Sequence, residues 1–389
     1  MRPDKEIKSL IKVFLKFKKK KKILNLHEPT FSGSEKRLLS NCVNTTFVST
    51  VGSYIDKFEA EISNYTKSKY VIATNSGTSA LHICLEALSI DENCEIMVPA
   101  VTFVGTVNAI LYTKATPHFI DCNKQDPNID LEKLEKYLYR NYQITKSYSY
   151  NKKTKKILKA IIPVHVFGHP VDMEKLQILA KKFKIDIIED AAEGIGSFYK
   201  KKHVGTLGNF GVISFNGNKT ITTGSGGVIL TSSKKFYLKM KHISSTSKIK
   251  KKWSYVHDEK GYNYRMNNIS AALGCAQMSK LEKFIKKKRE LFDFYKKSFE
   301  KFNSFEILKE PKDSRSNYWL QAIILKKNNY KKRDKYLSIL HKNGIKARPI
   351  WNLMNSLKFL KKYPKMNLSN SRSLEKRLIN LPSSAFLIK

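Results

Sequence analysis

The feature that most constrains the fold is an alternation of short apolar runs and helical patterns between residues 70 and 188. The apolar runs are 70–73, 95–98, 118–120, 159–164 and 185–188, and the helices predicted between them are 79–89, 104–112, 130–139 and 172–184. Strands that alternate with helices in this way indicate a mostly parallel sheet covered on both faces. We therefore predict an α/β fold, in which ligands bind beyond the carboxyl ends of the strands.

The chain is long enough for two domains, each with its own core. A helix is predicted at 54–61, before the first strand. A long helical pattern over 269–302 leads to a strand at 319–325 and a helix at 330–343. The segment 141–158 is polar, lysine-rich and without periodicity, which predicts an exposed insertion. The predicted divisions are a basic segment 1–22, a large α/β domain 23–270, and a linking helix with a smaller C-terminal α+β domain 271–389.

A lysine and an acid follow two of the predicted strands. Lys219 lies between the apolar run 211–213 and the glycine-rich stretch 224–227, a context that no other lysine shares. Asp190 follows the run 185–188. A pyridoxal phosphate enzyme needs a lysine that binds the cofactor covalently and an acid that keeps its pyridine nitrogen protonated. The alternative is a solvated lysine near a turn, so the assignment depends on the surrounding residues.

A phosphate-binding segment is predicted where the first strand meets the first helix, in the run T-N-S-G-T-S-A (74–80). A helix N-terminus offers free N–H groups and the positive end of its dipole, and Gly77 would let the backbone come close. An ordinary N-cap is the alternative, because Ser and Thr are preferred capping residues. The glycines at 224, 226 and 227 do not fit the dinucleotide fingerprint, which excludes that kind of site.

Ten segments match one known family in the same order along the chain. They include T-N-S-G-T-S-A-L-H (74–82), V-P-A-V-T-F-V-G-T-V-N-A (98–109), I-I-E-D-A-A-E-G-I-G-S (187–197) and S-F-N-G-N-K (214–219). On these residues the chain resembles the DegT/StrS nucleotide-sugar aminotransferases. It most resembles the branch that aminates UDP-linked 4-keto-6-deoxy-N-acetylhexosamines on the way to bacillosamine and legionaminic acid. The resemblance implies a pyridoxal phosphate-dependent transferase fold of the aspartate aminotransferase type.

The resemblance also implies pyridoxal 5'-phosphate as cofactor, with pyridoxamine phosphate as its aminated form. Lys219 would bind the cofactor and move a proton, Asp190 would pair with the pyridinium nitrogen, and Glu193 would lie near the ring hydroxyl. The remaining predicted cofactor contacts are with the phosphate and one ring face, from Gly77, Thr78, Ser79, Ser214 and Phe103. Some members carry His in place of this lysine and dehydrate their substrate, so Lys219 favours amino transfer.

Five further residues are candidates for substrate or subunit contacts. Asn263 matches a residue that reaches the phosphate of the neighbouring subunit, so the resemblance implies a homodimer with shared sites. Arg265 and Arg348 could anchor a carboxylate or diphosphate through a bidentate guanidinium, or form surface ion pairs. His165 lies at a predicted strand end, although a histidine at a turn is more often structural. Ser49 lies in a loop that shapes the active-site entrance in the family.

The charge of the chain does not indicate nucleic-acid binding. The formal net charge is +40, but the excess is almost all lysine and is spread from end to end. We find no paired zinc ligands and no RNP-like aromatic strand, and we predict neither a metal site nor specific nucleic-acid binding. A cationic surface should instead attract a nucleotide diphosphate sugar. Five cysteines without a C-x-x-C pair predict a reducing cytoplasm.

The basic segment 1–22 has two possible roles. Apolar residues recur in it at helical spacing, at Ile7, Leu10, Ile11, Phe14 and Leu15. Lysines interrupt each apolar stretch, which argues against a signal peptide, and no stretch is long enough for a membrane span. A basic amphipathic helix can make weak contact with an anionic membrane surface or pack on its own protein.

The leading functional prediction is the transfer of an amino group from an amino acid, L-glutamate, to a keto sugar. The acceptor predicted is the 4-keto carbon of a UDP-linked 4-keto-6-deoxy-N-acetylhexosamine, for bacterial surface-glycan biosynthesis. Alternatives within the same chemistry are another ring carbon or a GDP- or dTDP-linked sugar. Two alternatives are not aminotransferases. One is a non-catalytic regulatory relative, against which Lys219 and Asp190 argue, and the other is a basic membrane-associated assembly factor.

Overall fold

The computed structural model describes residues 5–18 and 22–388, and its largest sheet has nine strands. The strands of this sheet are β1 (Tyr70–Thr74), β2 (Cys94–Pro99), β3 (Thr116–Ile120), β4 (Tyr142–Ile144), β5 (Ser149–Asn151), β6 (Ile157–Ile161), β7 (Asp186–Asp190), β10 (Phe210–Ser214) and β11 (Gly227–Thr231). Their order is β1-β11-β10-β7-β6-β2-β3, with β5 paired to β6 and β4 to β5. All neighbours from β10 to β3 are parallel, which confirms the predicted α/β class.

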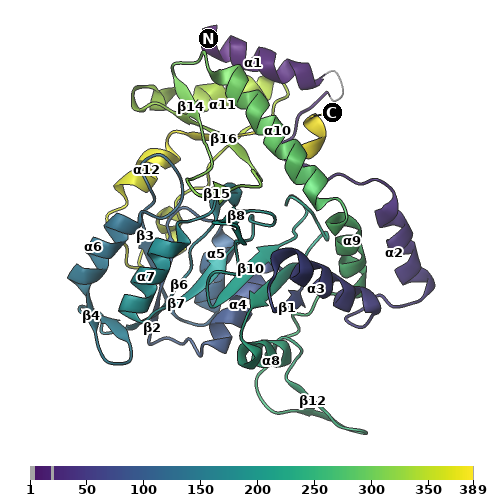
Figure 1. The fold of residues 1–389 in the computed structure, drawn as a ribbon. Helices are drawn as coiled ribbons and strands as arrows, with labels where there is room; N and C mark the ends of the chain where they lie inside the picture. The colour runs from purple at the N-terminus through teal and green to yellow at the C-terminus, as the bar shows by residue number, and fades with distance from the viewer. Residues whose placement is uncertain (1–4, 19–21, 389) are drawn as a thin grey trace.

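Helices join the parallel strands and pack around the sheet (Figure 1). They are α4 (Gly77–Ala87), α5 (Val104–Tyr112), α6 (Leu131–Asn141) and α7 (Met173–Phe183), each within a few residues of its prediction. Asp130 and Asp172 fix the starts of α6 and α7, because each carboxylate accepts the backbone N–H three residues further on. All five residues of β10 are buried, as expected for a strand covered on both faces.

Several shorter elements surround this sheet. Helices α2 (Ser34–Asn44) and α3 (Ser53–Thr66) precede it, and α8 (Lys234–Ile243) follows β11. Two strand pairs lie outside it: β8 (Phe198–Tyr199) with β9 (Lys202–His203), and β12 (Lys248–Lys250) with β13 (Tyr255–His257). The β12–β13 hairpin projects away from the sheet beyond α8 (Figure 1).

The prediction of an exposed insertion at 141–158 is wrong for much of this segment. Its residues form β4 and β5, an antiparallel hairpin that pairs with β6. The Tyr142 hydroxyl and the Asn151 amide both donate to the carboxylate of Glu95, which is fully buried on β2. The segment is polar and yet partly buried, because the buried carboxylate of Glu95 accepts the hydrogen bonds that these two side chains donate.

The C-terminal part has its own antiparallel sheet. The helical pattern over 269–302 forms two helices, α9 (Asn268–Met278) and α10 (Leu281–Phe299), rather than one. The sheet that follows contains β14 (Phe305–Ile307), β16 (Gln321–Leu325), β17 (Arg348–Pro349) and β18 (Leu378–Leu381), accompanied by α11 (Arg333–Lys342) and α12 (Ser369–Glu375). Strand β15 (Ser314–Arg315) pairs with β8 and so connects the C-terminal part to the region around β7.

The N-terminal helix α1 (Lys5–Lys18) packs on this C-terminal part (Figure 1). Ile7, Leu10 and Phe14 are fully buried, and the Phe14 ring contacts the edge of Tyr295 with ring centroids 5.6 Å apart. The apolar face that could have touched a membrane is therefore covered by the protein itself. Among the described residues, no helix is both long and apolar enough to cross a bilayer. The lysine run after α1 lies partly outside the described residues.

Candidate active site

A cavity of about 340 Å³ lies at the carboxyl ends of β7 and β10, the position expected for ligands in a parallel sheet. The C-terminal part closes it with two indole side chains, from Trp319 and Trp351. The structure brings seven of the predicted site residues to its walls: Gly77, Thr78, Phe103, Asp190, Glu193, Ser214 and Lys219. These residues come from four separate stretches of sequence, so the fold assembles the cavity that the motifs predicted.

Lys219 lies in a turn after β10, where its N–H donates to the Asn216 carbonyl at 2.9 Å. Its Nζ lies 3.2 Å from Glu193 Oε1 and 4.0 Å from the centre of a Trp319 ring. Only 12% of the lysine side chain is exposed. A carboxylate on one side and an aromatic face on the other both stabilise an ammonium group. The amine is therefore fixed in direction and shielded from bulk water.

Asp190 ends β7 and is almost wholly buried. Its Oδ2 accepts from the Thr106 hydroxyl at 2.6 Å and its Oδ1 from the Ala192 N–H at 3.1 Å. Burial raises the pKa of the Asp190 carboxyl above its ordinary value, and the two hydrogen bonds and the Lys219 charge oppose this rise. A carboxylate held this way can pair strongly with a cation that enters the cavity.

Glu193 lies opposite Lys219 and is also buried. Its Oε2 accepts the Phe167 N–H at 2.7 Å, and its Oε1 accepts from Lys219. Burial raises the pKa of Glu193, and the nearby ammonium of Lys219 opposes this rise. Phe167 adopts a left-handed backbone with φ of 58°. A non-glycine residue is rarely found in this conformation, and it directs the N–H of Phe167 toward the carboxylate.

The start of α4 and the end of β10 form a cradle that suits a phosphate group. Gly77 and Thr78 are the first residues of α4, and they face Ser214 across the cavity wall. A Cβ at Gly77 would lie 3.0 Å from the Ser214 Cβ, and one at Gly227 would lie 2.7 Å from the Gly77 nitrogen. Both glycines are needed for this close approach of strand and helix. The start of a helix carries free N–H groups that can bind an anion there.

Ser79 is not among the residues that line the cavity, and its contact with phosphate stays a prediction. Its N–H donates to the Ser76 hydroxyl at 3.1 Å, and the two hydroxyls lie 2.8 Å apart. Ser76 is the N-cap of α4. The sequence allowed either a cap or a phosphate site in this run; Ser76 forms the cap, and the phosphate contacts of Gly77 and Thr78 stay a prediction.

Phe103 is the N-cap residue of α5, lines the cavity, and is 58% exposed. Its ring centre lies 6.5 Å from that of Trp351, in a tilted arrangement. Gly105 makes room for this corner, because a Cβ there would lie 2.7 Å from the Thr78 hydroxyl. An exposed aromatic ring at the wall is free to cover one face of a planar ligand.

His165 is not at the cavity. It is fully buried, its Nε2 lies 3.0 Å from Glu189 Oε2, and its Nδ1 accepts the Val171 N–H at 3.0 Å. The Val171 bond leaves the proton on Nε2, which donates to Glu189. Both ring nitrogens are thus used within the core, and the alternative of a structural histidine is the one that the structure supports.

Four other candidates lie apart from the cavity of their own chain. Asn263 is exposed and forms a bridge with Ser245. The backbone of Arg265 pairs with Thr74, and Arg348 is exposed on β17. Exposed Ser49 accepts the Asn268 N–H through its carbonyl. Their roles toward substrate or a second subunit stay predictions.

Thr106, Trp319 and Trp351 also line the cavity and were not among the predicted site residues. Thr106 follows Phe103 by one helical turn, so its position was open to prediction once the start of α5 was placed. Trp319 and Trp351 had no local signal, because they reach the cavity from the C-terminal part of the chain.

The residues present fit pyridoxal phosphate. A helix start with a threonine and a serine suits the phosphate, the buried Asp190 suits a protonated ring nitrogen, and the shielded Lys219 amine can bind an aldehyde covalently. These three groups border one cavity, and the glycines keep the cradle open.

Comparison with known proteins identifies the family of the chain. Residues 30–388 match the DegT/DnrJ/EryC1/StrS aminotransferase family. The chain is 37% identical to the GDP-perosamine synthase of Escherichia coli O157:H7 over 364 residues, 93% of each chain. It is 34% identical to the UDP-4-amino-4,6-dideoxy-N-acetyl-beta-L-altrosamine transaminase of Campylobacter jejuni over 336 residues, 86% of this chain and 85% of the relative.

Among solved structures, Helicobacter pylori PseC, an aminotransferase involved in the biosynthesis of pseudoaminic acid, superposes with a TM-score of 0.83. That match has 27% identity and covers 94% of each chain. The predicted transferase fold is thereby confirmed, and with it the cofactor that the cavity accommodates. The chain belongs to the DegT/DnrJ/EryC1/StrS aminotransferase family and is a pyridoxal phosphate-dependent aminotransferase.

Proposed function

We propose that the protein moves an amino group from an amino acid, L-glutamate, to the 4-keto carbon of a nucleotide-linked 4-keto-6-deoxyhexose. The observation that carries this proposal is the single cavity in which Lys219, Asp190 and the phosphate cradle face one another. A lysine at this position serves amino transfer, since an amine can both bind the cofactor and carry a proton.

The residues have distinct tasks in such a reaction. Bound pyridoxal phosphate supplies an electron sink for the charge that develops at the α carbon of the donor. Asp190, whose carboxyl accepts from the Thr106 hydroxyl, would pair with the protonated ring nitrogen of the bound cofactor. Lys219 accepts the proton from the α carbon of the donor and returns it at the other end of the transfer. Glu193 holds the ammonium form of Lys219 between these two steps.

The nucleotide is best tested as GDP first and UDP second. The sequence resemblance predicted a UDP-linked N-acetylhexosamine, whereas the E. coli GDP-perosamine synthase is more similar to this chain than the C. jejuni UDP-sugar transaminase, at 37% against 34% identity. Both are similar over most of the chain, so the acceptor panel includes sugars with either nucleotide. Surface-glycan biosynthesis in the cytoplasm remains part of this proposal.

A panel of keto sugars with GDP, UDP and dTDP carriers decides the acceptor. Each is incubated with protein and L-glutamate, and the product is identified by NMR. We expect one carrier to be preferred and the new amine to lie on carbon 4. Lys219→Ala should abolish product formation and the visible absorbance of bound cofactor, while Lys235→Ala, an exposed lysine on α8, should retain both. Product formation by Lys219→Ala would refute the proposed chemistry.

We also propose a homodimer in which Asn263 completes the site of the partner subunit. Support comes from the exposure of Asn263 away from its own cavity, and from exposed apolar side chains near Ser49, which are Phe47, Val48 and Val51. Mixing inactive Lys219→Ala with Asn263→Ala tests this. Shared sites would restore activity, because a mixed dimer has one site with both native residues. A dimer without shared sites would show no gain.

A further inference from the structure

Trp319 is held by hydrogen bonds at its ring and at both ends of its backbone. Its indole N–H donates to the Asn218 carbonyl at 2.7 Å, directly before Lys219. Its N–H donates to Asn317 Oδ1 at 2.8 Å, and its carbonyl accepts from Lys288 Nζ at 3.1 Å. Only 4% of Trp319 is exposed. The ring therefore has little freedom to leave its position, 4.0 Å from the Lys219 amine.

Lys288 on α10 is an unusual residue to find behind this tryptophan. It is fully buried, and its Nζ donates to the carbonyls of Trp319 and Ser383 at 3.1 and 2.6 Å. In the described part of the chain it forms no ion pair. Burial lowers the pKa of Lys288 to about 7. An apolar side chain would fill this volume at no desolvation cost, so packing alone does not explain a lysine here.

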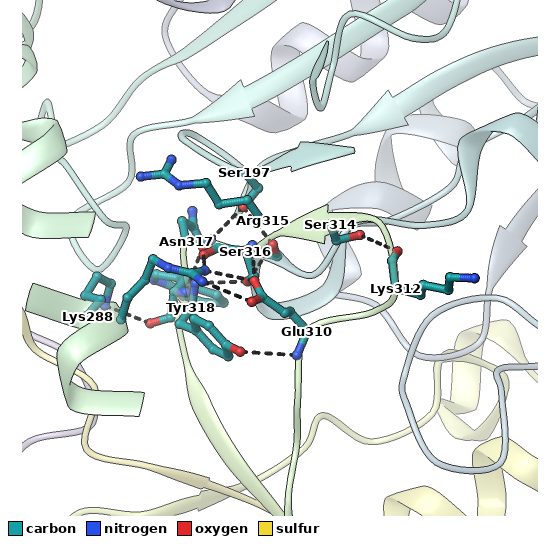
Figure 2. A network of polar contacts seen from close by, with 12 residues as sticks. Ser197, Lys288, Glu310, Lys312, Ser314, Arg315, Ser316, Asn317 and Tyr318 are labelled. Atoms are coloured by element: carbon teal, nitrogen blue, oxygen red, sulfur yellow. Dashed lines mark hydrogen bonds and ion pairs between the residues drawn. The ribbon is translucent and has the colours of Figure 1, made fainter. Parts of the chain in front are cut away.

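The segment before Trp319 is strained and firmly anchored. Tyr318 adopts a left-handed backbone with φ of 48°, a conformation that a bulky residue keeps only where neighbours enforce it. The Asn317 amide donates to the carbonyls of Glu193 and Ile195, both at 2.8 Å. Figure 2 shows the surrounding polar network, in which Glu310 accepts from the Ser316 N–H. One segment thus fixes Glu193 and Trp319, the two groups that contact the Lys219 amine.

We propose that Trp319 is a positioning residue for the Lys219 amine, and that the buried Lys288 holds Trp319 in place. In amino transfer the C–H bond at the α carbon of the donor breaks, the proton goes to the Lys219 amine, and the electron pair goes to the bound cofactor. An indole face stabilises the resulting ammonium more than the neutral amine, so it favours the proton transfer itself. This step rests on the proposed function, whereas the Lys288–Trp319 contact does not depend on it.

The kinetic test changes the ring. Trp319→Leu removes the aromatic face, and we expect kcat to fall about 2- to 30-fold, the range of cation–π energies, with KM changed less than about 2-fold. Trp319→Phe keeps a ring but loses the indole N–H, and its kcat should lie between those of the wild type and Trp319→Leu. The isotope effect from α-deuterated L-glutamate should increase in both variants. A merely misfolded fraction would lower kcat without changing the isotope effect.

The second test changes the residue behind the ring. Lys288→Met fills a similar volume without donors, and we expect kcat to fall about 3- to 10-fold with a larger isotope effect. Lys288→Arg restores donors and should recover part of the loss. Lys287→Met is the matched control, because that neighbouring lysine donates to the Ile388 carbonyl and not to Trp319. It should behave like the wild type.

A fluorescence measurement separates this inference from the proposed function, because it needs neither cofactor nor substrate. In a Trp253→Phe, Trp351→Phe background, acrylamide quenching reports only Trp319. We expect Lys288→Met to increase the quenching constant about 2-fold or more, and Lys287→Met to leave it unchanged. The inference would be overturned if Lys288→Met had the same quenching constant, kcat and isotope effect as the wild type. An unchanged isotope effect in Trp319→Leu would overturn it as well. An inactive wild type would instead refute the proposed function.

Discussion

The hydrogen bond from Thr106 to Asp190 offers a direct test of how the site holds negative charge. Thr106 Oγ1 lies 2.6 Å from Asp190 Oδ2, and both side chains are buried. Thr106→Val keeps the shape of the side chain and removes the hydroxyl. A hydrogen bond to a charged group is worth about 1.5–3 kcal/mol. We expect the free energy of unfolding of the cofactor-free protein to fall by about this amount at neutral pH.

The loss should depend on pH in a defined direction. Burial raises the pKa of Asp190 above its ordinary value of 3.8, and the Thr106 hydroxyl opposes that rise, so its removal raises the pKa further. Because the folded pKa is above the unfolded one, the folded protein binds more protons in this range. Its stability therefore decreases as the pH rises from about 3.8 through the folded pKa of Asp190. The variant should lose least at acid pH and most at neutral pH.

Thermal unfolding from pH 4.5 to 8 measures this. For 389 residues, the expected loss corresponds to a decrease in Tm of about 2–4 °C at neutral pH, and to less at pH 4.5. Thr102→Val is the matched control, because its hydroxyl lies 2.9 Å from that of Thr106 and does not contact Asp190. Its effect should be smaller and independent of pH. An equal loss for Thr106→Val at every pH would show that the hydroxyl does not stabilise the charged form of Asp190.

Two further variants test the cradle and the N-terminal helix. Gly227→Ala places a Cβ 2.7 Å from the Gly77 nitrogen, and it should weaken pyridoxal phosphate binding about 10-fold or more in equilibrium dialysis. Gly217→Ala is the control and should not weaken binding, because the nearest atom to its Cβ lies 3.8 Å away. Equal affinities would contradict the cradle. Phe14→Ala should lower the free energy of unfolding, measured in urea, by about 3–5 kcal/mol, because Phe14 is fully buried. Leu15 is 45% exposed, so Leu15→Ala should lower it by about 0.5 kcal/mol or less. A similar cost for both would show that α1 is not part of the core.

Much of the fold could be predicted because its signals are local. The apolar runs and helical spacing between residues 70 and 188 are short-range patterns, and the aspartates that cap α6 and α7 act over three residues. Lys219 and Asp190 could be singled out for the same reason, since Asp190 ends β7 and Lys219 lies in the turn after β10. Local signals left two alternatives open for His165, and a distant residue decided between them, because Glu189 Oε2 lies 3.0 Å from its Nε2.

The parallel sheet and the cofactor could be predicted from the sequence, because strand and helix periodicity and the motifs at strand ends are properties of contiguous residues. The groups that surround the Lys219 amine are fixed by long-range packing instead. Trp319 contacts it from 100 residues further along the chain, and Lys288 supports that tryptophan from another helix. Such contacts depend on how the C-terminal part packs against the ends of β7 and β10, and no local pattern in the chain encodes that packing.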